Sequence, residues 1–278
     1  MDRVLQVQHL GGDRWTAPHP DEDPEQRDVV FGGQLLGQMI MVATAGGGGA
    51  KEVKSIHAVF ARGGAYSVGP VEYEREQMHD GRAWASSTIT ASQGDRLLSR
   101  SLVLLNRVEP DLIRHAVAMP DVPDPEDCPP QPITVVFPGT EARPVDRPDA
   151  RTADGAPMRS VWIRPQTFED VAANQAVVAW SSPGFTIGTA MQAHPDTVRI
   201  SDAHRTVSTG VISHTVHFHD HPTPGAWLLV VSTAAFAGNG RVYGHGSVFT
   251  QDGTLVATFG QDAMVRRADA SIDPRRGM

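Results

Sequence analysis

Histidines gather at residues 214–221, in the run His-Thr-Val-His-Phe-His-Asp-His. Alternate side chains of a β-strand share one face, so His217, His219 and His221 would lie together if this segment is extended. Three imidazoles are a ligand set for zinc or nickel. Pro222 marks the end of such a strand directly afterwards, which favours adventitious metal binding over a specific site. We therefore expect neither a metal centre nor a cofactor.

His214, the first of these histidines, is also a candidate general base, because a neutral imidazole accepts a proton near pH 7. A purely structural role for it stays open. The sequence has no Gly-x-Ser-x-Gly elbow, which argues against a serine hydrolase of the α/β type. The glycines at 32, 33 and 37 lack the Gly-x-Gly-x-x-Gly spacing, and no βαβ unit follows them, which argues against a dinucleotide site.

Composition narrows the class of protein further. The 278 residues are 40% hydrophobic and 20% charged, which is too apolar for disorder, and the net charge of -8 disfavours general nucleic-acid binding. Cys128 is the single cysteine, so no intramolecular disulfide forms and a reducing cytoplasm is expected. The first residues lack a signal-peptide pattern, and the apolar run 35–45 is too short to span a bilayer.

An internal repeat organises the chain. Gly81-Arg-Ala-Trp84 matches Gly240-Arg-Val-Tyr243 at an offset of 159 residues, and the stretch around His57 resembles the stretch around His214 at an offset of 157. The collinearity of these matches predicts two structural copies of one unit. We place them at residues 1–109 and 158–267, with a linker over 110–157 that is rich in proline and acidic residues and a tail over 268–278.

Each copy is predicted to hold one long helix followed by an antiparallel sheet. The first copy is expected to form a buried helix over 31–45, stopped by the glycines at 46–49, and strands over 55–62, 71–79, 84–92 and 97–107. The second copy is expected to form a helix over about 168–180 and strands near 207–218, 227–236, 240–250 and 254–266. In the linker, proline disfavours regular structure, apart from one short strand or packed segment over 133–137.

Four further stretches carry a recognisable pattern: Val30-Phe-Gly-Gly-Gln34, Val161-Trp-Ile-Arg164, Ala190-Met-Gln-Ala-His194 and Thr250-Gln-Asp-Gly253. With these motifs the chain resembles the type II acyl-CoA thioesterases, the TesB-like family. The resemblance implies an α+β double hotdog, in which two tandem helix-plus-sheet units form a pseudo-dimer. It also implies hydrolysis of acyl-CoA to a free fatty acid and CoA by an activated water.

The family's catalytic set of Asp, Thr or Ser, and Gln is only partly present. The glutamine is matched by Gln261, whereas Pro183 falls at the aspartate position and Val211 at the hydroxyl position. Neither replacement can form a side-chain hydrogen bond. Ser182 adjoins Pro183, and Ser213 stands where the family has a nearby aspartate. The candidate catalytic residues are therefore Gln261, Ser182, Ser213 and His214.

The substrate side of the site is expected at Gly32 and Gly33, which open the first helix and offer backbone N–H groups to an oxyanion. Arginines 62, 82, 241 and 266 either contact CoA phosphates or lie solvated at strand ends.

Three functions follow from this sequence. The first is a thioesterase with a diverged catalytic set, and the second is a protein that binds acyl thioesters without cleaving them. A hydratase is the third, on fold analogy alone. Acyl-CoA is the expected partner, with no nucleic acid and no membrane, and assembly into a homo-oligomer is expected.

Overall fold

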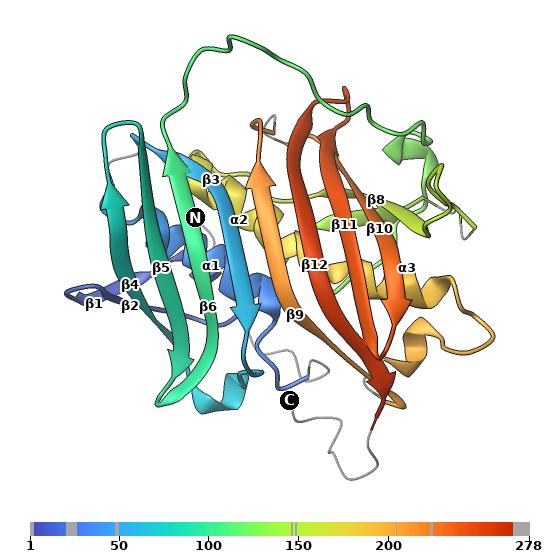
Figure 1. Cartoon of the computed structure of the whole chain (residues 1–278), viewed down its shortest axis with the longest axis horizontal. Coiled ribbons are helices and arrows are strands. Elements are labelled where there is room, and N and C mark those ends of the chain that lie inside the picture. Colours follow the sequence, from blue (N-terminus) through green and yellow to red (C-terminus); the bar gives the residue numbers. More distant parts are fainter. Residues whose placement is uncertain are drawn as a thin grey trace.

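The computed structural model describes residues 3–20, 27–47, 50–145, 147, 149–203, 205–222 and 225–268. Within these ranges the strands form one twelve-stranded antiparallel sheet in the order β1-β2-β4-β5-β6-β3-β9-β12-β11-β10-β8-β7. The α-helices lie on one face of this sheet (Figure 1). Of the predicted tail, only residue 268 lies inside the described ranges.

The first copy contains the predicted helix and all four predicted strands. Its elements are β1 (Gln8–Gly11), β2 (Arg14–Ala17), α1 (Gly32–Thr44), β3 (Glu52–Phe60), β4 (Val71–Asp80), β5 (Trp84–Gln93) and β6 (Arg96–Asn106). Leu35, Leu36, Met39 and Ile40 of α1 are buried against the sheet, as their spacing predicts. The short hairpin of β1 and β2 was not predicted.

The second copy repeats this plan with additional elements. It contains β8 (Met158–Arg164), α2 (Val171–Ser181), α3 (Thr186–Gln192), β9 (Val207–Phe218), β10 (Leu228–Gly238), β11 (Arg241–Thr250) and β12 (Leu255–Arg267). The linker, expected to hold no strand here, adds β7 (Glu141–Pro144), which pairs with β8 at the edge of the sheet. The Asp170 carboxylate caps α2 by accepting a 2.9 Å hydrogen bond from the Ala172 N–H. The sequence reasoning did not predict α3, β7 or β8. Helix α1 packs on the strands of the first half and α3 on β10, β11 and β12 of the second, while α2 packs against α1 between them. This arrangement confirms the double hotdog.

The two halves join through β3 and β9, which pair in the middle of the sheet. Within β3 the buried residues are Val53, Ile56 and Ala58, whereas His57 points to the exposed outer face. In β9 it is His214 that is buried. The match of His57 with His214 is therefore wrong by one residue, because neighbouring strand residues face opposite sides. Ile56 occupies the place of His214 at an offset of 158.

Helices α1 and α2 pack closely because glycines of α1 face α2. A Cβ atom on Gly33 would lie 2.0 Å from the carbonyl oxygen of Trp180, and one on Gly37 would lie 3.1 Å from the carbonyl oxygen of Ala176. Close approach of two helix backbones requires such small residues. The contact places the start of α1 beside the end of α2, where the candidate site lies.

The linker packs against the C-terminal half of the sheet. Cys128 and Val145 form a buried cluster with Trp162, Trp227 and Leu229 of that half. Residues 133–137 form a packed turn rather than a strand, with Phe137 fully buried. Among the described residues, no helix has the length and apolar character needed to cross a membrane.

Candidate active site

Three of the predicted catalytic residues meet on the helix side of the sheet. Ser182 begins the 3₁₀ turn that follows α2, His214 lies on β9, and Gln261 lies opposite His214 on β12. The Ser182 Oγ is 2.7 Å from His214 Nε2, and His214 Nδ1 is 2.9 Å from Gln261 Oε1. Both ring nitrogens of the histidine are thus engaged by the two other side chains.

This cluster is buried. His214 has 0% of its side chain exposed, and Ser182 and Gln261 each have 1%. The Phe259 ring stacks beside the imidazole with a centroid distance of 5.7 Å. Burial lowers the pKa of His214 to about 3; the hydrogen bond with Gln261 opposes this shift, and the charge of His57 adds to it slightly. His214 is therefore neutral at physiological pH.

A neutral imidazole carries one N–H, so the protons have two consistent arrangements. In the first arrangement, Gln261 Oε1 faces the imidazole, so His214 Nδ1 donates to Oε1 and Ser182 Oγ donates to Nε2. With the amide turned over, Gln261 donates to Nδ1, Nε2 donates to Ser182, and Ser182 donates to the Ala179 carbonyl oxygen 3.0 Å away. Either way, one polar atom of the buried Gln261 amide has no partner in the described part of the chain.

The predicted substrate-binding glycines adjoin the cluster. Gly33 packs against Trp180, two residues before Ser182, and a Cβ atom on Gly32 would lie 3.3 Å from the Phe60 ring. The first N–H groups of a helix have no partner within the helix, and the helix dipole favours negative charge there. The position suits a developing oxyanion; the role itself stays a prediction.

Two further polar residues lie nearby, and the sequence reasoning missed both. Thr186, at the start of α3, is fully buried, and its Oγ1 is 3.4 Å from Ser232 Oγ of β10. The methyl group of Thr186 occupies the space that a Cβ on Gly244 would need, at 2.5 Å. Gly244 pairs with Gln261, so this approach brings Thr186 close to the site. The glycines of β11 were the available signal.

The fourth predicted residue, Ser213, does not join the cluster. It lies one residue before His214 on β9, so its side chain faces the outer side of the sheet, where its Oγ donates a 3.0 Å hydrogen bond to Asp262. A bulge at Ile212 shifts the register between β9 and β12, so that Val211 pairs with Ala263. Pro183 is buried beside Ser182.

The histidines considered for a metal site are dispersed. His217 is exposed on the outer face, His219 hydrogen bonds to Thr258, and His221 Nε2 lies 3.1 Å from a Glu52 carboxylate oxygen. In the part of the chain that the structure covers, no three His, Cys, Asp or Glu residues are placed to hold a metal ion.

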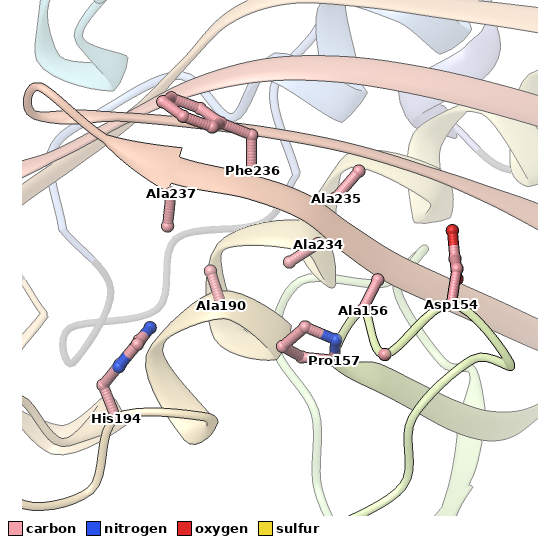
Figure 2. Close-up of a pocket in the computed structure, with 10 residues that line it drawn as sticks. Asp154, Ala156, Pro157, Ala190, His194, Ala234, Ala235, Phe236 and Ala237 are labelled. Carbon is pink, nitrogen blue, oxygen red and sulfur yellow. The ribbon is translucent and has the colours of Figure 1, made fainter.

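A hollow of about 330 Å³ runs along the end of β10 at residues 234–237, past the last residue that pairs with β8. Alanines and Pro157 line most of it. Asp154 and His194 lie at opposite sides and do not point toward each other (Figure 2). This arrangement offers no paired catalytic groups, so we place the candidate site at His214.

Comparison with known proteins agrees with this fold. Residues 19–106 match the acyl-CoA thioesterase N-terminal domain, and residues 125–265 match the acyl-CoA thioesterase C-terminal domain. These matches cover most of the chain in the expected order. The chain is a double-hotdog protein, and it belongs to the acyl-CoA thioesterase family.

Individual relatives are distant. The chain is 23% identical to acyl-coenzyme A thioesterase 8 of Mus musculus, over 95% of this chain and 88% of that protein. It is 26% identical to acyl-CoA thioesterase 2 of Haemophilus influenzae, over 85% of this chain and 87% of that protein. The crystal structure of acyl-CoA thioesterase II TesB2 from Mycobacterium marinum shares the fold, with a TM-score of 0.81, 24% identity and coverage of 96% and 98%.

Proposed function

We propose that this protein hydrolyses acyl-CoA thioesters to a free fatty acid and CoA, with the reaction at the free side of the Gln261 amide. The observation that carries the proposal is the unpartnered polar atom of that amide, buried beside the Ser182–His214 pair. A buried amide atom without a partner costs about 1–3 kcal/mol, which a bound water or substrate carbonyl would recover.

The proposed chemistry uses the arrangement in which Gln261 Nε2 is free. That N–H donates to the thioester carbonyl oxygen, whose negative charge grows as water adds to the carbon. The proton of the attacking water passes to Ser182 as the Ser182 proton passes to Nε2 of His214. The adduct then expels CoA thiolate, which takes this proton back, so the products are the carboxylic acid and CoA thiol.

His214 is a weak base in this scheme. Its pKa of about 3 means that the imidazolium formed during proton transfer is poorly stabilised. A general base usually contributes about 10²–10⁴-fold to the rate, and a base so far below neutral pH gives less. We expect slow turnover, supported mainly by the amide and by backbone N–H groups at Gly32 and Gly33.

Release of CoA thiol from C2–C18 acyl-CoAs tests the proposal. The wild type should release thiol, and Gln261→Ala should lower kcat by about 10²-fold, as loss of one oxyanion donor does. Ser213→Ala is the matched control, because its side chain faces the outer side of the sheet. No release above the Gln261→Ala background would refute hydrolysis.

A non-catalytic acyl-thioester binding protein is the second candidate. It is favoured by Pro183 and Val211, which supply no hydrogen-bonding side chain where the family set has an aspartate and a hydroxyl. Calorimetry separates the two: binding of a long-chain acyl-CoA without thiol release supports this candidate, and no binding counts against it. Assembly into a homo-oligomer stays a prediction, which sedimentation velocity would check.

A further inference from the structure

A second hollow, of about 390 Å³, lies where β8 and the end of α3 meet the linker. Its described lining includes two arginines, Arg147 and Arg159, and two glutamines, Gln131 and Gln192, together with three prolines and a valine. None of these lining residues carries a carboxylate. The hollow therefore presents hydrogen-bond donors and positive charge.

Arg159 reaches this hollow from the helix side of the sheet. It alternates with Val161 and Ile163 of β8, whose side chains belong to the main core. Its Nη1 lies 3.3 Å from the position that a Cβ on Gly188 would occupy, so α3 passes over the guanidinium. Gln192 lies one turn further along α3 and lines the same hollow.

The charge of Arg159 is not compensated within the described part of the chain. No carboxylate or other acceptor there forms an ion pair or hydrogen bond with it, and burial lowers the pKa of its guanidinium. By contrast, Arg143 and Arg164 share the Glu141 carboxylate at 2.8 and 2.5 Å. A guanidinium stays charged at all working pH values, and a partly buried charge normally has a partner.

From this hollow and its uncompensated cation, we propose that Arg159, with Arg147 and Gln192, binds a phosphate-class oxyanion. The guanidinium fork matches phosphate oxygens in pairs. Arg147 donates one N–H to the Asp121 carbonyl oxygen and keeps others for a ligand. A chain with net charge -8 has abundant acids, yet among the described residues none pairs with Arg159, which leaves room for an external anion.

Two sources supply this chemistry. One is free phosphate, and the other is the phosphates of CoA, which lie at the far end of the pantetheine arm from the thioester. Arg159 is on β8 and Gln261 on β12, three strand spacings or about 14 Å apart across the sheet. The anion would thus lie well away from the reacting carbonyl. Only the CoA source rests on the proposed function.

Isothermal calorimetry and thermal unfolding of the full chain test the site, with chloride used to hold the ionic strength constant. The probes are inorganic phosphate and adenosine 3′,5′-bisphosphate, which carries two phosphates on the nucleoside of CoA. Wild type should bind a probe and melt higher with it. Arg159→Gln should weaken binding by about tenfold or more. In chloride alone, this variant should melt at or above the wild type, because it removes an unpaired charge.

Arg164→Gln is the matched control, since this arginine lies on the same strand but pairs with Glu141, and it should bind the probes as wild type does. Arg147→Gln carries the same test if Arg159→Gln does not fold. Tighter binding of the bisphosphate than of phosphate identifies CoA as the source, and equal binding identifies free phosphate. No binding to wild type, or equal binding to Arg159→Gln, overturns the site. Gln261→Ala should keep anion binding whether or not hydrolysis occurs, which separates the two proposals.

Discussion

Gly33 of α1 lies against the backbone of Trp180 in α2, so closely that a Cβ atom on it would stand 2.0 Å from the Trp180 carbonyl oxygen. Gly33→Ala should therefore force the helices apart and destabilise the fold by about 1–3 kcal/mol or more, as overpacking does. Urea unfolding measures the loss. Gly47→Ala is the control, because the nearest atom to its added Cβ is 3.4 Å away. Equal stability of the two variants would contradict the close crossing.

Ser182 and Ser213 should respond differently to substitution by alanine. Ser182→Ala leaves His214 Nε2 buried without its hydrogen-bond partner, so it should lower stability by about 1–3 kcal/mol and reduce kcat. Ser213→Ala removes a hydrogen bond on the outer face and should change stability by about 0.5 kcal/mol or less. Unfolding curves and thiol-release rates check both. A larger kcat effect at Ser213 would place the reaction on the outer face of the sheet and contradict the site at His214.

The buried His214 should make folding sensitive to acid. Its pKa is about 3 in the folded chain and about 6.5 when unfolded, so the unfolded state binds a proton that the folded state rejects. The free energy of unfolding should be at its full value above pH 6.5 and fall as the pH drops toward 3, by about 5 kcal/mol in total. Urea unfolding between pH 4 and 8 measures this slope.

His214→Gln should flatten that slope, whereas His217→Gln should leave it unchanged, since His217 is exposed on the outer face. An unchanged slope in His214→Gln would assign the acid sensitivity to other groups.

The pH profile of kcat should show no inflection near pH 6.5. Because the low pKa of His214 keeps it neutral throughout the range, kcat should be level between about pH 5 and 8 once spontaneous thioester hydrolysis is subtracted. Steady-state thiol release across this range is the measurement. A limb centred near pH 6.5 would point to a solvated histidine as the base instead.

Local patterns in the sequence predict much of this fold. The bounds of β9, 207–218, follow from its many β-branched residues, and the turn at Asp80-Gly81 fixes the hairpin of β4 and β5. Other elements are set by tertiary packing. Helix α3 has seven residues and follows Pro183-Gly184, so its helical signal is weak, and it is held by contact with β10 and β11.

Local sequence patterns predict the candidate site less well than they predict the fold. Gln261 meets His214 because β9 and β12 pair in one particular register, and pairing between distant segments is not encoded by periodicity. Strand alternation alone, however, would have separated Ser213 from His214. Arg159 gave no signal, because its lack of an acidic partner among the described residues is visible only once the chain is folded.

The pairing of β3 with β9 joins two unequal halves into one body. His214 and Gln261 face each other in the second half, and at the same offset of 158 residues Ile56 and Val103 face each other in the first. In a symmetric homodimer, any substitution would appear at both places at once. Covalent fusion removes that constraint, so the first half can have an apolar pair at the position where the second half has a polar pair. The chain therefore behaves as a heterodimer whose two subunits are joined in one polypeptide.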